Sequence, residues 1–231
     1  MTVKRSLQEL LAVDEPAWQI VQNWVQSAAN AVEVLQPAPN LRGQALEEIQ
    51  VTVRSPMGAV VYETGGILVD HGWLRVLGSG HPKLRRSLPE WNRRRSISAD
   101  GNERRLLLVA DDAVGGFYAL NAGAFGPEAG QVFYFAPDSL RWGSLNGMGY
   151  GQFLAWALSD KLSLFYRLMR WDGWESEVTS VGGDSAFSIY PPLCSKEGKD
   201  ISKCSRKPCP IEEVYQLNVV DFPAQLASER S

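Results

Sequence analysis

Apolar residues recur at helical spacing near the start of the chain. We predict a helix from about Asp14 to Ala31, with Asp14 as its N-cap and Pro16 in its first turn, where a missing N–H is tolerated. One face of this helix carries the apolar stripe Trp18, Val21, Trp24, Val25 and Ala28. Such a stripe is more typical of core packing than of a ligand site.

A second helical region follows a break at Gln36 to Asn40. The segment from Leu41 to Ile49 reads as a short amphipathic helix that passes into a strand-like stretch, residues 51–53. Ser55 and Pro56 are typical of an N-cap and a first helical position, so we expect another helix here. The pair Gly65 and Gly66 predicts its end, because glycine favours the left-handed position after a helix.

The middle of the chain is rich in short β-type runs bounded by glycine and turn residues. These predicted strands are residues 67–69, 73–77, 106–110, 117–120, 132–135 and, later, 187–190. The turns between neighbouring runs are short, which indicates an antiparallel meander. No alternation of strands with helices appears, and this excludes a doubly wound parallel sheet.

Helical spacing returns near Tyr150 and continues to about Met169. We also predict a short helix at residues 88–93 and short helical or mixed segments at 211–217 and 222–226. The polar stretch from Arg93 to Asn102 is expected to form an exposed, mobile loop, and residues 194–210 an irregular loop.

These elements together predict an α+β fold. We expect a single domain with a mainly antiparallel sheet of about six strands flanked by helices. Residues 1–50 form its N-terminal helical part, 51–190 the central sheet with helices, and 191–231 a C-terminal extension. No linker is long enough to separate two domains.

The composition is typical of a globular protein, and the sequence also indicates a cellular location. Of the 231 residues, 45% are hydrophobic and 21% are charged, with a net charge of −3. This charge creates no overall attraction to nucleic acid or anionic membrane. The segment from Met1 to Asp14 lacks the apolar core of a secretory signal, and no run reaches the roughly 18 apolar residues of a spanning helix. We therefore expect a cytoplasmic location.

The three cysteines do not predict a disulfide framework or a zinc site. Cys194, Cys204 and Cys209 are odd in number and lack a Cys-x-x-Cys pair, while both histidines lie far upstream. We expect three reduced thiols and neither a metal nor a cofactor.

Four residues are the candidates for catalysis. His71, His81, Asp111 and Asp112 could form a pocket for a small molecule or a hydrolase-like reaction, if they converge. The alternative is structural, because aspartates at a strand end commonly cap the following turn. Adjacent residues in a strand also point to opposite faces. No nucleophile elbow, Walker loop or dinucleotide fingerprint is present, and the glycine-rich stretches read as tight turns.

Basic residues concentrate in residues 83–105. They are Lys83, Arg85, Arg86, Arg93, Arg94, Arg95, Arg104 and Arg105. Such a stretch could contact phosphates, which makes a nucleic-acid binder an alternative function. A solvated loop is the commoner origin of single-sign runs, and the stretch includes only one aromatic residue, Trp91.

Residues 106–158 resemble the SUKH superfamily, which includes bacterial immunity proteins and fungal regulators of cell-wall synthesis. The similar elements are a buried strand ending in Ala110-Asp111-Asp112, the run from Gly116 to Asn121, the run from Gly130 to Phe135, and a helix containing Phe153-Leu154-Ala155-Trp156. The stretches 72–89 and 141–151 are similar to an uncharacterised bacterial branch, carried as a domain of unknown function.

The resemblance implies a SUKH-like fold and a protein partner. Members of the superfamily bind other proteins, often toxins, and neutralise them by occlusion; they share no catalytic residues. We therefore expect a non-catalytic, immunity-like protein-binding domain, with aromatic residues as interface anchors. The candidate partner-binding residues are Trp73, Arg75, His81, Trp91, Asp111, Asp112 and Trp142.

Overall fold

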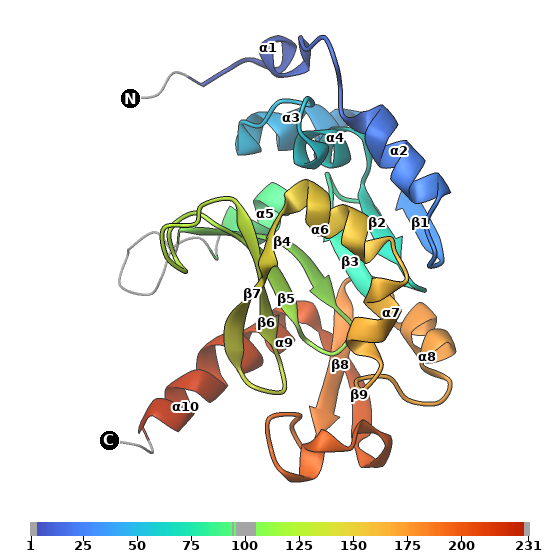
Figure 1. Cartoon of the computed structure of the whole chain (residues 1–231), viewed down its shortest axis with the longest axis vertical. Helices are drawn as coiled ribbons and strands as arrows, with labels where there is room; N and C mark the ends of the chain where they lie inside the picture. The colour runs from blue at the N-terminus through green and yellow to red at the C-terminus, as the bar shows by residue number, and fades with distance from the viewer. Residues whose placement is uncertain (1–3, 94, 96–104, 229–231) are drawn as a thin grey trace.

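A computed structural model describes residues 4–93, 95 and 105–228 of the chain. Its centre is a seven-stranded sheet in which every neighbouring pair is antiparallel and the strand order follows the chain. The strands are β1 (Val32–Leu35), β2 (Gly66–Val69), β3 (Leu74–Leu77), β4 (Leu106–Asp112), β5 (Phe117–Asn121), β6 (Gln131–Ala136) and β7 (Arg141–Gly149). The predicted antiparallel meander is therefore confirmed (Figure 1).

Register assigns each strand residue to one of the two faces. One row of partners across the sheet consists of Glu33, Leu68, Arg75, Asp111, Phe117, Phe135 and Trp142. The neighbouring row on the opposite face contains Val76, Ala110, Tyr118 and Tyr134. Because side chains alternate along a strand, Asp111 and Asp112 point to opposite faces.

Helices cover the face that carries Tyr118. They include α2 (Trp18–Gln26), α4 (Pro56–Glu63), α6 (Tyr150–Ala157) and α7 (Lys161–Tyr166). The Tyr118 and Phe153 rings lie 4.9 Å apart, which joins α6 to the sheet. As predicted, Ser55 caps α4: its hydroxyl accepts a hydrogen bond from the Gly58 N–H at 3.0 Å.

The opposite face is covered by helices and by a small second sheet. Tyr215 at the end of α9 (Ile211–Tyr215) packs edge-on against Phe117 at 5.0 Å and against Trp91 of α5 (Leu88–Arg93) at 6.0 Å. The second sheet pairs β8 (Ser185–Tyr190) with β9 (Ser205–Pro210). The remaining elements are α1 (Leu7–Leu11), α3 (Pro39–Ile49), α5 (Leu88–Arg93), α8 (Trp174–Val181), η1 (Glu197–Lys199), η2 (Ile201–Lys203), α9 (Ile211–Tyr215), the π-helical η3 (Gln216–Asp221) and α10 (Phe222–Ser228).

The structure corrects several predicted elements. The first helix is shorter than predicted and begins after Ala17, which makes no side-chain cap, so Asp14 is not its N-cap. Residues 51–53 do not form the predicted strand, since 51 and 52 are irregular and a turn begins at 53, and α4 ends at an extended Thr64 rather than at a left-handed glycine. Strands β1 and β7 and helix α8 were not predicted, and β9 lies in the segment predicted to be irregular. The stretch from Arg93 to Asn102 falls largely outside the described residues.

None of the described helices has the length and apolar character required to cross a membrane.

Candidate functional site

Asp111 lies at the centre of a buried ionic network on one face of the sheet. Its Oδ1 is 2.9 Å from Nε of Arg75 on the neighbouring strand, and its Oδ2 accepts a hydrogen bond from Nη1 of Arg86 at 2.6 Å. The side chains of Asp111, Arg75 and Arg86 are 0%, 1% and 6% exposed. A carboxylate buried with two cations at this depth has a structural role: it joins β4 to β3 and to the loop that carries Arg86.

The two arginines use their remaining donors on the protein itself. Arg86 donates to the Gly183 carbonyl at 2.7 Å and to the Asp184 carboxylate at 3.3 Å, while Arg75 donates to the Ser185 carbonyl at 2.9 Å. Burial lowers the pKa of Arg75. Burial acts on Arg86 in the same direction, but the charge and hydrogen bonds of Asp111 outweigh it and the pKa of Arg86 is raised. Both guanidinium groups remain protonated.

Asp112, on the other face, caps the turn that follows β4. Its Oδ1 accepts hydrogen bonds from the N–H groups of Val114 at 3.0 Å and Gly116 at 2.7 Å. Its Oδ2 accepts from the hydroxyls of Tyr134 and Tyr166, both at 2.8 Å. A Cβ at Gly116 would lie 2.2 Å from this Oδ2, so the turn requires glycine. The prediction that the aspartate caps the following turn is therefore confirmed for Asp112 and wrong for Asp111.

Asp112 and its tyrosines titrate abnormally. Burial raises the pKa of Asp112, although hydrogen bonds from Gly116, Tyr166 and Tyr134 partly offset that effect. Burial, together with the negative charge of Asp112, holds the pKa values of Tyr118, Tyr134 and Tyr166 well above the ordinary tyrosine value. The tyrosines therefore stay protonated and serve as donors at any physiological pH.

We expect the stability of the protein to depend on pH through Asp112. Because its pKa is higher in the folded than in the unfolded chain, the folded state holds the proton more tightly. This contribution is complete below the ordinary aspartate pKa of about 3.9 and is lost as pH rises through the raised value. Asp112→Asn removes it. The difference in unfolding free energy between wild type and variant should change by up to about 1.4 kcal/mol per pH unit in that window.

Urea denaturation at a series of pH values measures this difference. The matched control is Asp138→Asn, which removes an exposed carboxylate that lies outside this hydrogen-bond network. A wild-type minus Asp112→Asn difference that does not vary with pH would show that Asp112 has an ordinary pKa.

The four residues considered for catalysis do not share a cleft. Asp111 and Asp112 are buried on opposite faces of the sheet. His71 is exposed, packs edge-on against Trp174 at 5.9 Å and lines a groove to which His81, Asp111 and Asp112 do not contribute. The Nδ1 of His81 accepts a hydrogen bond from the Lys83 N–H at 3.1 Å. The hypothesis of a pocket formed by these four residues is therefore wrong.

Most of the proposed interface residues lie in the interior of the protein. Trp73 and Trp91 are buried at 0% and 2% exposure, as are Arg75, Asp111 and Asp112, so none of them is an exposed anchor. Trp73 packs among aromatic rings, and Trp91 lies under Arg86, whose guanidinium carbon is 4.5 Å from the ring centre. Half-buried Trp142 and His81 stay candidates for partner contact.

Apart from exposed Arg105, the described basic side chains of this stretch are paired with carboxylates, buried or stacked on an aromatic ring, so they do not form a free cationic surface. Lys83 pairs with Glu33 at 2.6 Å, Arg85 with Asp184 at 3.2 Å and Arg93 with Glu48 at 2.7 Å. Arg86 is buried, as described above, and the guanidinium carbon of Arg95 lies 3.4 Å from the centre of the Trp91 ring. Arg94 and Arg104 lie outside the described residues.

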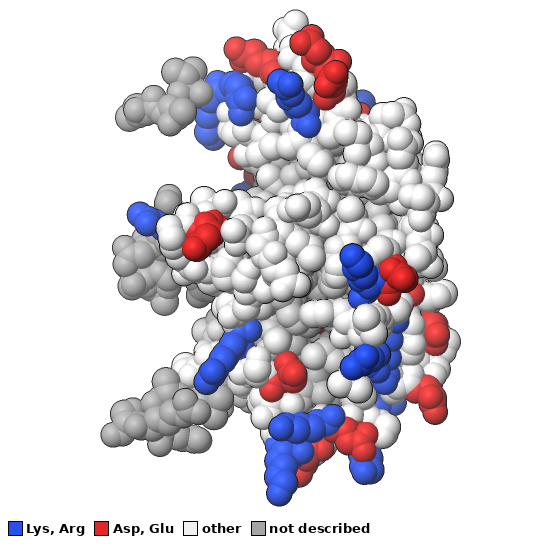
Figure 2. Space-filling model, in the orientation of Figure 1, with Lys and Arg blue, Asp and Glu red and all other residues white. Residues whose placement is uncertain are grey.

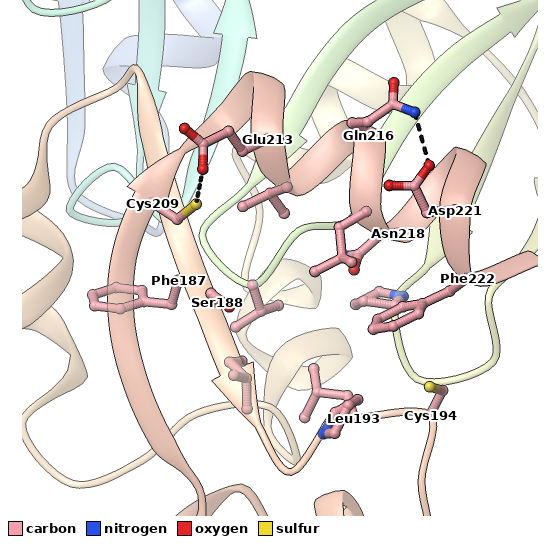
Figure 3. A pocket seen from close by; sticks show the side chains of 16 residues that line it. Phe187, Ser188, Leu193, Cys194, Cys209, Glu213, Gln216, Asn218, Asp221 and Phe222 are labelled. Atoms are coloured by element: carbon pink, nitrogen blue, oxygen red, sulfur yellow. Dashed lines mark hydrogen bonds between the residues drawn. The ribbon is translucent and has the colours of Figure 1, made fainter. Parts of the chain in front are cut away.

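A groove of about 460 Å³ opens between β8 and the C-terminal helices, and we call it the C-terminal groove (Figure 3). Its walls come from β8, the 192–194 turn, α9 and the π-helical η3. The apolar lining includes Val114, Pro137, Phe187, Ile189, Pro192, Leu193, Val214, Leu217 and Phe222. The polar lining is Ser188, Cys194, Cys209, Glu213, Gln216, Asn218 and Asp221. π-Helical turns occur frequently at functional sites.

The thiols that line the C-terminal groove are not activated. Burial raises the pKa of Cys209, and its thiol donates to the Glu213 carboxylate at 3.3 Å, which raises it further. Burial also raises the pKa of Cys194. A thiol that stays protonated is a poor nucleophile and a poor metal ligand. Within the described ranges, no group of three or more histidine, cysteine or acidic side chains is placed to hold a metal ion.

A second feature is the uncharged face, formed by the charge-free outer sides of α2 and α6 and continued by the apolar side chains of α7 and of the turn after it. No charged residue occurs from Pro16 to Val32 or from Trp142 to Ser159. Figure 2 shows that no lysine, arginine or acidic side chain covers α2 and α6 on this side of the molecule. The face carries exposed Ile20, Leu164, Phe165 and Leu168, and half-buried Trp24 and Trp156.

Neither feature was recognised from the sequence alone. The two charge-free segments are visible in the sequence and were a usable signal for the uncharged face. The C-terminal groove left no such signal, because its lining residues come from segments separated along the chain and match no motif.

Comparison with known proteins adds a family and two relatives. The family described as "Protein of unknown function DUF2625" matches residues 7–214. The uncharacterised protein YbfG of Escherichia coli (strain K12) is 41% identical over 215 residues, 92% of this chain and 95% of that protein. An uncharacterised protein of Haemophilus influenzae (strain Rd) is 37% identical over 217 residues, 94% of this chain and 95% of that protein. No solved structure matches the chain.

Proposed function

Because the chain belongs to the DUF2625 family, which carries no assigned activity, its function must be argued from geometry, and we propose that it is a non-catalytic protein-binding domain. Its partner docks on the uncharged face. The observation that carries this proposal is the group of exposed apolar side chains at Leu164, Phe165 and Leu168, next to the charge-free outer side of α6. The function is the one expected from the sequence, but the docking surface proposed for it lies away from the buried tryptophans.

Exposed apolar side chains on the uncharged face supply the driving force. Leu168 is 77% exposed, Leu164 61% and Phe165 39%, and all three lie on or just after α7. Phe165 packs edge-on against Trp156 at 5.3 Å, which makes the patch continuous with α6. Large contiguous apolar patches on a soluble protein mark interaction sites.

The lack of charge on this face selects the kind of partner. Interface cores are depleted of charged residues and enriched in aromatic residues, because an unpaired buried charge is costly. Lys161 and Arg167 lie at the ends of α7 and are exposed, so they belong to a polar rim. The complementary partner surface is apolar and weakly charged.

Hydrogen bonds from the backbone and from one side chain join the two helices of the uncharged face. The Ala29 N–H donates to the Leu158 carbonyl at 2.9 Å, and the Asn30 side chain donates to the carbonyls of Ala157 and Ser159 at 3.1 and 2.7 Å. These bonds fasten the end of α2 to the end of α6. A preorganised surface loses little conformational entropy on binding, which favours affinity.

The buried polar groups support binding over catalysis. The carboxylates of Asp111 and Asp112 are fully occupied by protein donors, and neither lines a described groove. The resemblance to the SUKH superfamily adds the proposal that the partner is a toxin, which the domain would neutralise by occlusion. A toxin is one kind of protein partner that would dock on the uncharged face.

We expect the double variant Leu164→Glu/Leu168→Glu to lose its partner. Two charges in the centre of an apolar interface should weaken binding by about 2 kcal/mol or more, which is about 30-fold in affinity. The test is a pull-down with tagged protein, quantified by mass spectrometry, followed by titration of the purified partner. The matched control is Leu41→Glu, because Leu41 on α3 is 41% exposed and lies away from this face.

The proposal requires that a partner is lost from the double variant and retained by the control. The same proteins captured by both variants, or no specific capture by wild type, would contradict it. A wild-type dimer that the double variant dissolves in light scattering would assign the face to self-association instead.

A further inference from the structure

The C-terminal groove combines apolar walls with negative charge, and we propose that it binds a small amphipathic organic cation. The ligand has an apolar body and an ammonium or guanidinium group. This site is separate from the uncharged face, because α9 packs on the opposite side of the sheet from α6. The inference therefore stands or falls independently of the proposed function.

The apolar part of the groove fits a compact hydrophobic body. Leu193 and Phe222 extend toward its interior from two different segments (Figure 3), while the Phe187 ring packs behind β8 against Trp171. Its volume of about 460 Å³ falls within the roughly 300–1,000 Å³ of small-molecule pockets. Burying an apolar ligand surface here supplies affinity without selecting charge.

The charge of the lining selects a cation. Glu213 and Asp221 line the groove, and no lysine, arginine or histidine does so among the described residues. A third carboxylate, Asp138, is close enough to raise the pKa of Cys194. Lys207 acts on the pKa of Cys209 in the opposite direction but does not line the groove. Two carboxylates and no basic side chain on the described lining favour a bound cation over an anion.

The two lining carboxylates have unused acceptor capacity. Glu213 accepts one hydrogen bond from the Cys209 thiol, and Asp221 accepts one from the Gln216 amide at 2.8 Å. Both donors are neutral, and neither carboxylate forms an ion pair with the described lysines and arginines (Figure 3). A carboxylate offers about four lone-pair sites, so each can accept the N–H donors of a bound cation.

A pair of fluorescent probes with the same body and opposite charge tests this inference. Dansylcadaverine carries an ammonium group, and dansyl-aminohexanoate carries a carboxylate on a chain of similar length. In a fluorescence titration of the full chain at low salt, the cation should bind saturably and about tenfold more tightly than the anion. The variant Glu213→Gln/Asp221→Asn should lose this preference while retaining apolar binding.

Two further variants locate the effect. Glu212→Gln is the matched control, because Glu212 is exposed, precedes Glu213 in α9 and does not line the groove, so its preference for the cation should match wild type. Ser188→Trp fills the groove and should abolish binding of both probes in a chain that is still folded by circular dichroism. Equal affinity for the two probes, no saturable binding, or a preference that survives Glu213→Gln/Asp221→Asn would overturn the inference.

Discussion

Replacing Asp111 with asparagine is expected to lower the free energy of unfolding by about 3–5 kcal/mol. The change keeps the shape of the side chain and removes its charge. Arg75 and Arg86 then remain in the interior without their shared counter-ion, and at 1% and 6% exposure neither can recover its hydration. The penalty comes mainly from the uncompensated buried charge of Arg75, since Arg86 keeps the Asp184 carboxylate at 3.3 Å, more than from the loss of one attraction.

Urea denaturation followed by circular dichroism measures this loss. The matched control is Glu48→Gln, which breaks the more exposed ion pair with Arg93 and should cost less than about 1 kcal/mol. A loss at Asp111→Asn no larger than that of the control would mean that water or another anion compensates the two arginines.

Trp73→Ala should destabilise the protein by about 3–5 kcal/mol. The Trp73 ring is 0% exposed and packs against Tyr166, Trp171 and Trp174 at centroid distances of 5.4, 5.7 and 5.1 Å. The guanidinium carbon of Arg170 lies 5.1 Å from the ring centre. Alanine leaves a cavity. The side chains around it are held in place by β3, α7 and α8, so the cavity closes only partly.

Trp73→Phe separates a packing role from a role in binding. Phenylalanine fills most of the space, and the buried Trp73 ring N–H has no hydrogen-bond partner among the described residues, so its removal should cost little. We expect a smaller loss of unfolding free energy than for Trp73→Ala and unchanged partner capture. Partner binding that is lost in the folded Trp73→Phe variant would return Trp73 to the interface.

The prediction of individual elements succeeded where local chemistry decides. Ser55 and Pro56 begin α4 because capping acts within a few residues, and the apolar runs at β4, β5 and β6 are strands buried in the interior of the sheet. β7 was missed because it is an edge strand with glycine and polar residues, whose pattern resembles a turn. β1 was missed because its four residues follow directly on a helical stripe.

The residues of the candidate site show the same contrast between roles set by local sequence and roles set by tertiary contacts. The turn-capping role of Asp112 follows from its place before Gly115 and Gly116, which is a local property. The role of Asp111 depends on Arg75 lying opposite it on β3 and on Arg86 reaching it from a loop. Register and packing decide such partners, and neither is encoded within a short window of sequence.

The sequence by itself determined the fold class, the antiparallel meander and the two charge-free segments, because periodicity, capping and composition are read along the chain. Only the tertiary structure decided that Trp73 and Trp91 are buried and that Leu164 and Leu168 are exposed. It also brought Glu213 and Asp221 to one groove with Phe187. Burial and proximity are properties of the packed whole, since each depends on residues distant in sequence that remove water from the same place.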